Sequence, residues 1–108
     1  MGERRKMVYI SGAMTGEKDY KRHFANADSE LELKGYKVVN PAFVDMVIPS
    51  ATYEEYMKID LQLLDMCDAI YMLNNWESSR GANREYGYAL AKGMEIMYEP
   101  EATGEMAV

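Results

Sequence analysis

The chain has 108 residues, of which 48% are hydrophobic and 28% are charged, and its formal net charge is −6. This length suits one domain with a core of its own, so we expect a single domain over residues 1–108 that ends in a polar tail at 99–108. The acidic balance disfavours nucleic-acid binding, because a nucleic-acid interface needs a basic face. No apolar run approaches the roughly 18 residues of a membrane span, which argues against a membrane partner.

Cysteine, tyrosine and methionine usage adds to this picture. The single cysteine, Cys67, excludes an internal disulfide and is typical of a reducing compartment, so we expect a cytoplasmic protein. Ten methionines and nine tyrosines suit core gaps and half-buried surfaces, which favours a homo-oligomer, a dimer or higher. No metal-ligand spacing, dinucleotide-binding motif or P-loop is present, so neither a metal nor a cofactor is predicted.

The first half of the chain predicts two strands with a helix between them. Residues 7–10 (MVYI) form a buried strand that leads into the loop 11–19. Apolar residues at helical spacing predict a helix that begins after Asp19, its expected N-cap, and stops at Gly35. Residues 36–39 (YKVV) form the second strand, and 42–51 is expected to be irregular.

The second half repeats the alternation of helix and strand. Thr52 and Glu55 have the spacing of a capping box and predict a helix over about 53–67. A strand at 69–73, a helix from about 81 to 92 that ends at Gly93, and a strand at 94–98 follow. Alternating strands and helices predict parallel pairing with right-handed crossovers. We therefore expect an α/β fold: one three-layer, Rossmann-like or flavodoxin-like domain with a four-stranded parallel sheet in the order 2-1-3-4.

The stretch 69–93 carries the strongest functional signal. A buried strand stops at a polar turn, and in an open α/β sheet ligands bind at the carboxyl ends of the strands. The helix that follows places Glu85 on one face with Ala82 and Ala89, small residues that suit packing on the sheet. Side chains lean toward the helix N-terminus, so we expect the Glu85 carboxylate at the mouth of the turn.

Other polar residues fall at the same edge of the predicted sheet. Tyr9 and Ser11 lie at the end of the first strand, and Asp60 interrupts an apolar stripe, where an acid is costly unless it is paired or functional. The backbone N–H groups of residues 80–83 begin a helix and suit an anion.

Simpler structural roles exist for three of these candidates: Glu85 as a surface acid favoured by the helix dipole, Ser79 as an N-cap, and Asp60 as a structural acid. His23, Arg80 and Arg84 are expected to be solvated.

Five pieces of the chain also carry a family resemblance, and together they reach to about residue 98. They are YISGAMTG at 9–16, F-x-x-A with a later GY at 24–36, NPA at 40–42, DLQLLDMCDAIYML at 60–73 and NWESSRGANREYGYALAKG at 75–93. In this combination the chain resembles the nucleoside 2-deoxyribosyltransferase-like superfamily, and within it short phage and bacterial proteins similar to deoxynucleoside monophosphate N-hydrolases.

The resemblance implies catalytic roles for three residues. It implies that Glu85 is the nucleophile that attacks C1′ of the sugar, that Asp60 assists proton transfer or orients the sugar, and that Tyr9 positions the nucleophile. Ser79 lies six residues before Glu85, where the transferases carry an acid and the monophosphate hydrolases a phosphate-contacting serine, so hydrolysis is favoured. Where the hydrolases have an arginine in the first loop, this chain has Thr15. The positive charge that binds the phosphate would then come from Arg80 or from a partner subunit.

The resulting hypothesis is cleavage or transfer at the N-glycosidic bond of a nucleoside or nucleoside 5′-monophosphate. Two carboxylates suit this chemistry, since one can capture the developing sugar cation and the other can deliver a proton to the base. Trp76 in the turn can stack on a base or simply pack. A nucleotide-sensing module without catalysis and a phage-type interaction protein are the alternatives. The expected substrate-binding residues are Ser11, Gly12, Met14, Trp76, Ser79 and Gly81.

Overall fold

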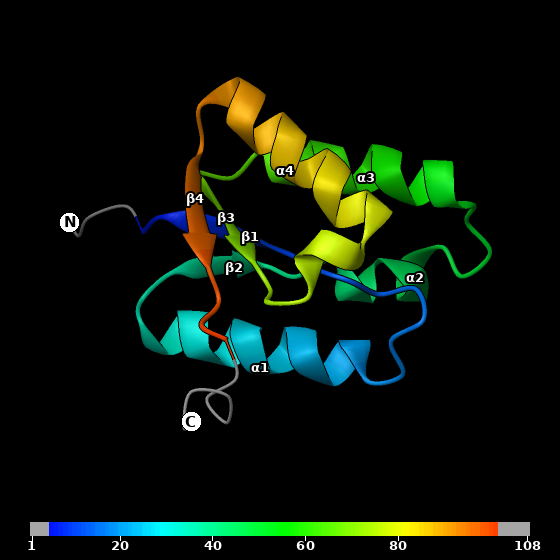
Figure 1. The fold of residues 1–108 in the computed structure, drawn as a ribbon, viewed down its shortest axis with the longest axis horizontal. Helices are drawn as coiled ribbons and strands as arrows, with labels where there is room; N and C mark the ends of the chain where they lie inside the picture. The colour runs from blue at the N-terminus through cyan, green and yellow to red at the C-terminus, as the bar shows by residue number, and fades with distance from the viewer. Residues whose placement is uncertain (1–4, 102–108) are drawn as a thin grey trace.

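A computed structural model describes residues 5–101 and arranges them around a four-stranded parallel sheet (Figure 1). The sheet order is β2-β1-β3-β4, as predicted. The strands are β1 (Met7–Ser11), β2 (Lys37–Val39), β3 (Ala69–Met72) and β4 (Glu95–Tyr98). The α-helices are α1 (Tyr20–Leu33), α2 (Val44–Val47), α3 (Tyr53–Asp65) and α4 (Arg80–Lys92), with short 3-10 helices η1 (Pro41–Phe43) and η2 (Trp76–Ser78).

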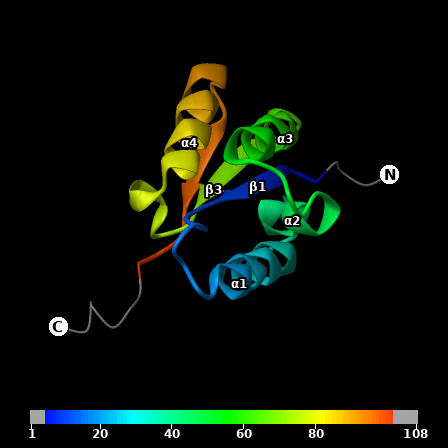
Figure 2. The same cartoon turned by 90° about the vertical axis from the view of Figure 1, so that its right-hand side faces the viewer.

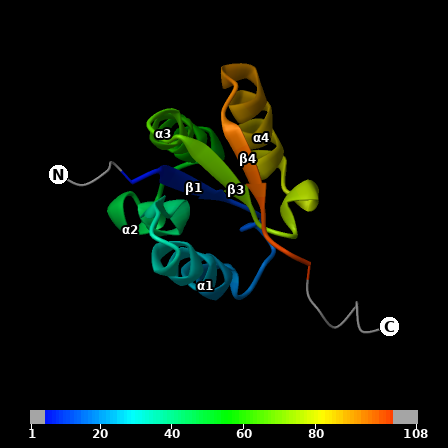
Figure 3. The same ribbon diagram turned by 90° about the vertical axis from the view of Figure 1, so that its left-hand side faces the viewer.

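Helices cover both faces of the sheet, which gives the three predicted layers. Helix α1 lies on one face, and α3 and α4 lie on the other (Figures 2 and 3). The central strand β1 pairs with β2 and β3, with Tyr9 opposite Val39 on one side and Ile70 on the other. Within residues 5–101, no helix is both long and apolar enough to cross a membrane.

Side-chain alternation along β1 divides the core into two clusters. Val8 and Ile10 pack toward α1, in a cluster that also contains Phe24 and Leu31. Tyr9 faces the opposite way and packs toward α3 and α4. Because successive residues of a strand point to opposite faces, Ser11 turns toward the same side as Tyr9. The sheet therefore directs two hydroxyl groups toward α4.

Most helix ends follow the local sequence signals. Thr52 and Glu55 form the predicted capping box of α3, Ser79 caps α4 through the N–H group of Ala82, and Gly93 ends α4 in the left-handed region at φ 73°. A glycine suits that position because it has no side chain to clash. Asp19 precedes α1 as expected, but its side chain makes no capping hydrogen bond.

The segment 42–51, expected to be irregular, contains helical turns instead. The Asn40 side chain accepts a 3.0 Å hydrogen bond from the N–H group of Ala42, and Pro41 occupies the first helical position of η1. A proline is suited to that position because its φ is already helical and its missing N–H would have no partner there. Helix α2 follows directly and brings Asp45 next to α1, where it contacts Tyr20.

Candidate functional site

Glu85 of α4 is the centre of the candidate site. Its carboxylate accepts a 2.7 Å hydrogen bond from the Tyr9 hydroxyl and a 2.6 Å hydrogen bond from the Ser11 hydroxyl. The helix pattern predicted this carboxylate at the mouth of the turn. The residue is only 5% exposed, so it lies deeper, inside the fold. The sheet is the reason, because α4 packs on β1 and β3 and buries the face that carries Glu85. A buried carboxylate held by two donors has a defined orientation.

Two opposing effects act on the ionisation of Glu85. Burial raises its pKa from the ordinary 4.5 to about 7, while the hydrogen bonds from Ser11 and Tyr9 stabilise the charged form and lower it, and the charge of Asp60 adds a smaller upward effect. Burial also raises the pKa of Tyr9 well above its usual range, so this residue stays a donor. The net effect raises the pKa of this carboxyl group toward neutral pH.

Asp60 of α3 is the second acid of the site. It is 8% exposed, and its Oδ1 atom is buried without a hydrogen-bond partner among the described residues. Burial raises its pKa from 3.8 to about 7. A buried acceptor that lacks a donor costs free energy unless a ligand satisfies it. Two acids with such values next to one cavity are typical of a functional site.

Both acids line a cavity of about 710 Å³ that is formed by five segments of the chain. It opens at the carboxyl end of β1, where the loop after the strand, the start of α1, the η1–α2 segment, α3 and the start of α4 meet. Its volume falls within the range of sites that hold a small molecule. Six of the predicted site residues line it: Gly12, Met14, Asp60, Ser79, Gly81 and Glu85. Tyr9 and Ser11 lie behind Glu85 and support it.

Trp76 is not brought to the cavity. Its ring packs against Tyr86, with 4.7 Å between the ring centroids, and it lies on η2 beside a separate hollow near the end of β4. Of the two roles considered for Trp76, the structure therefore has the packing role. The sequence placed it near the site in the chain, but the turn directs its side chain onto Tyr86 of α4.

The start of α4 forms a cationic rim of the cavity. Ser79 and Arg80 line it, and the Arg80 guanidinium lies 4.4 Å from the ring centroid of Tyr53, a cation–π distance. The N–H groups of Ala82 and Asn83 already bond to Ser79. At most those of Arg80 and Gly81 are therefore available to an anion, two donors and not the predicted four.

Several lining residues were not predicted as site residues, although Thr15 lies in the motif at 9–16 and Tyr53 and Tyr56 follow the Thr52 capping signal. They are Thr15, Tyr20, Asp45, Tyr53 and Tyr56. Asp45 is the most consequential, because it places a third carboxylate at the cavity. Its segment was expected to be irregular, and only the docking of α2 beside α1 brings it there. The apolar spacing that predicted α1 already contained Tyr20, but it gave no sign that the hydroxyl would face this cavity.

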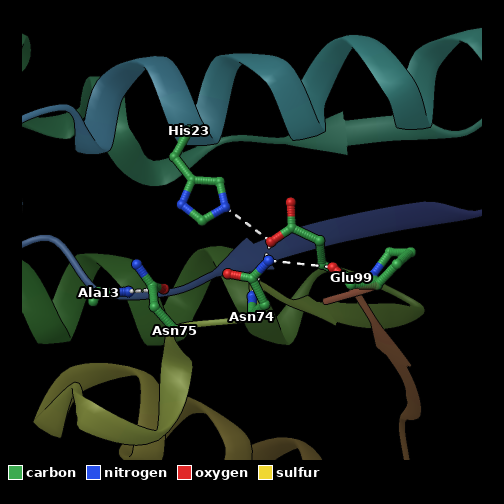
Figure 4. Close-up of polar contacts among 6 residues, drawn as sticks. Ala13, His23, Asn74, Asn75 and Glu99 are labelled. Carbon is green, nitrogen blue, oxygen red and sulfur yellow. Dashed lines mark hydrogen bonds and ion pairs between the residues drawn. The ribbon is translucent and has the colours of Figure 1, made fainter. Parts of the chain in front are cut away.

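The turn after β3 holds one wall of the cavity in place (Figure 4). The Asn75 side chain accepts a 3.2 Å hydrogen bond from the N–H group of Ala13, in the loop that carries Gly12 and Met14. The backbone N–H group of the neighbouring Asn74 donates to the Glu99 carboxylate at 2.9 Å. The side-chain amide of Asn74 donates to the backbone carbonyl of Pro100.

His23 takes part in this arrangement and is not solvated, contrary to expectation. Its Nε2 atom lies 2.8 Å from a Glu99 carboxylate oxygen, and its side chain is 27% exposed (Figure 4). The beginning of the predicted polar tail is thus attached to α1 and to the turn after β3; residues 102–108 lie outside the described part. Arg84 bonds to Glu54 at 3.1 Å and Arg80 lies 3.9 Å from the same carboxylate, but their side chains are 39% and 75% exposed, so both remain in contact with solvent as expected.

The chain belongs to the family described as "Domain of unknown function (DUF4406)", which matches residues 6–98. A comparison with curated proteins finds no match. Among solved structures, the CMP N-glycosidase BcmB of Clostridium botulinum is similar, with 25% sequence identity and a TM-score of 0.61. The similarity covers 86% of this chain and 67% of that chain.

Proposed function

We propose that this member of the DUF4406 family is an enzyme that cleaves the N-glycosidic bond of a nucleoside 5′-monophosphate, with Glu85 as nucleophile and water as the final acceptor. The observation that carries the proposal is the Glu85 carboxylate, buried, held by Tyr9 and Ser11, and present in the wall of a cavity of about 710 Å³. The similarity to a CMP N-glycosidase supports the same class of reaction.

The two acids of the site divide the work according to their hydrogen bonds. Glu85 accepts two hydrogen bonds that stabilise its charged form, whereas the buried Asp60 Oδ1 has no donor among the described residues. When the pair holds a single proton, that proton therefore belongs on Asp60 and the negative charge on Glu85. Pairs of acids whose environments differ in this way supply the acid and the nucleophile of many enzymes.

The proposed reaction has two steps. A Glu85 oxygen attacks C1′ of the sugar, the bond between C1′ and the base nitrogen breaks, and the base leaves with the proton of Asp60. Water then attacks C1′ with Asp60 as base, which releases the free sugar phosphate and regenerates the Glu85 carboxylate. Retaining glycosidases use the same division between a nucleophilic carboxylate and an acid that becomes a base.

The start of α4 supports a phosphorylated substrate. Ser79 and Arg80 line the cavity there, and a helix N-terminus favours an anion through its free N–H groups and its dipole. Arg80 would supply at the cavity the positive charge that Thr15 of the first loop does not. Ser79 also favours hydrolysis over transfer to a second base, as the family resemblance implies.

The experiment that tests the proposal is incubation with a panel of nucleosides and their 5′-monophosphates, followed by chromatography for free base. We expect base release from a monophosphate and none from the chain with Glu85→Gln, which keeps the volume but removes the nucleophile. Thermal melting with the same ligands separates catalysis from binding, because a ligand that binds only the folded state raises the midpoint. Stabilisation without base release would identify a nucleotide-sensing module instead.

A further inference from the structure

Asp45 is a cavity carboxylate for which the proposed reaction has no use. It lies on α2, and one of its oxygens accepts a 3.3 Å hydrogen bond from Tyr20 and lies 3.2 Å from the Lys21 ammonium. The other oxygen, Oδ1, is buried and has no hydrogen-bond partner among residues 5–101. An acceptor in this state is costly unless a donor reaches it. Because the terminal torsion of an aspartate is soft, a modest turn of the carboxylate presents either oxygen to a ligand.

The walls around Asp45 are suited to a flat, mainly apolar group. Phe24, Pro41 and Ala42 line the same cavity, as do the rings of Tyr20 and Tyr56. Tyr20 also packs edge to face on Phe24, with 6.3 Å between their ring centroids, which fixes the hydroxyl that holds Asp45. Aromatic and aliphatic walls with one polar group at a defined place are typical of a site that binds a ring and fixes its orientation.

The charges of the cavity give a bound nucleotide a direction. Arg80 begins α4, which lies on one face of the sheet, whereas Asp45 is on α2 on the other side of β1 (Figures 2 and 3). A phosphate is attracted to the Arg80 side. The Asp45 carboxylate is paired with Lys21 and presents only acceptor oxygens, to which a phosphate oxygen cannot donate. With the sugar at Glu85, the base is the part of the nucleotide that remains for the Asp45 side.

From this arrangement we propose that Asp45 reads the base and selects nucleobases that carry an exocyclic amino group, an inference that rests on the proposed function. A carboxylate can only accept hydrogen bonds. The amino group of cytosine, adenine or guanine can donate to the Asp45 carboxylate. Uracil and thymine carry a carbonyl oxygen at the ring position of the cytosine amino group, and the lone pairs of that oxygen would face the carboxylate.

The test compares ligands that differ in the exocyclic amino group and in the proton on the adjacent ring nitrogen. Binding of CMP and UMP, and of dCMP and dUMP, is measured by calorimetry with the Glu85→Gln chain, which cannot consume them. The purine 5′-monophosphates AMP, GMP and IMP extend the comparison, since IMP lacks the amino group. We expect the amino-bearing ligand of each pair to bind roughly 10- to 100-fold more tightly, as for a buried hydrogen bond that one ligand makes and the other leaves unmade.

The variant Asp45→Asn separates recognition from a structural role. An asparagine both donates and accepts, so the preference for CMP over UMP should fall toward unity, with UMP binding gained as CMP binding is lost. Glu32→Gln removes an exposed acid of α1 outside the cavity and should leave the preference unchanged. If the Asp45→Asn chain does not fold, Tyr20→Phe, which releases Asp45 from its hydroxyl partner, should weaken the preference without changing the packing on Phe24.

The outcomes distinguish this inference from the proposed function. Equal binding of CMP and UMP, or an equal loss of both in Asp45→Asn, would overturn the role of Asp45 while base release could persist. A preference for amino-bearing ligands without any base release by the unsubstituted chain would support Asp45 and overturn catalysis. No binding of any nucleotide would overturn both.

Discussion

The Tyr9 hydroxyl donates a 2.7 Å hydrogen bond to Glu85 across 76 residues of chain. Both residues are almost completely shielded from solvent, and Ser11 completes the arrangement from the same strand with a 2.6 Å bond. The central strand therefore supplies two donors to a single carboxylate on α4. This holds the carboxylate in one orientation and stabilises its charge, the two properties that a nucleophilic carboxylate needs.

Replacing Tyr9 with phenylalanine tests this support. The hydrogen bond lowers the pKa of Glu85, so in Tyr9→Phe that pKa rises and the charged carboxylate forms at higher pH. We expect the acid limb of the pH profile for base release to move upward. The free energy of unfolding should also fall by about 1–3 kcal/mol, because a buried acceptor loses its donor. Stopped assays between pH 5 and 9 measure the profile.

Tyr71→Phe is the matched control for this variant. Tyr71 is a buried tyrosine of β3 that belongs to the other core cluster, on the α1 face of the sheet. The Tyr71→Phe substitution should leave the pH profile for base release unchanged. A profile that is unchanged in Tyr9→Phe would show that the hydroxyl only fills space.

Asp60→Asn tests the proton transfer to the departing base. The volume is preserved, but the buried side chain can no longer deliver or accept the proton, so the rate should fall roughly 10²- to 10⁴-fold. Substrates whose leaving base needs no proton should lose much less, and this difference separates a general acid from a residue that only orients the sugar. An equal loss on both kinds of substrate would assign Asp60 to orientation.

The two acids also predict how stability depends on pH. Burial raises the pKa of Glu85 and that of Asp60 to about 7 from 4.5 and 3.8. Acids with a raised folded-state pKa contribute stability that is complete below their unfolded pKa and is lost as pH rises through 7. We expect the free energy of unfolding to fall by on the order of 2–5 kcal/mol between pH 5 and 8 through this pair.

Denaturant unfolding at several pH values measures that fall. The double variant Glu85→Gln with Asp60→Asn should flatten the curve relative to the unsubstituted chain, whereas Glu32→Gln should not. A slope that persists in the double variant would mean that both acids are as well solvated in the folded chain as in the unfolded one.

Two glycines give opposite predictions for an added methyl group. A Cβ at Gly12 would lie 2.6 Å from Leu73 Cδ1, so Gly12→Ala forces the cavity loop away from β3 and should cost about 1–3 kcal/mol together with activity. A Cβ at Gly87, inside α4, meets nothing within 4 Å. Gly87→Ala should therefore stabilise the chain by about 0.5–1 kcal/mol, because alanine has the higher helix propensity. Thermal melting of both variants tests the contrast.

Sequence alone predicted the α/β fold, the four strands and their order, because burial patterns and turn residues act locally and parallel crossovers have one hand. It also placed Glu85, Asp60 and Ser79 at the carboxyl edge of the sheet, where all three line one cavity. These features follow from residues that are close together in the chain or from the regular geometry of strands. The Thr52 capping box is predictable for the same reason.

Tertiary packing decided what periodicity cannot encode. The depth of Glu85, the separation of Trp76 from the cavity, the contact of His23 with Glu99 and the arrival of Asp45 at the cavity all depend on how segments dock. Asp45 shows the reason most clearly, since a four-residue helix in a segment without a motif is placed by its contacts with α1 and not by its own propensity. Local sequence therefore set the elements and the first two acids of this protein, while long-range packing set the burial that tunes those acids and added the third.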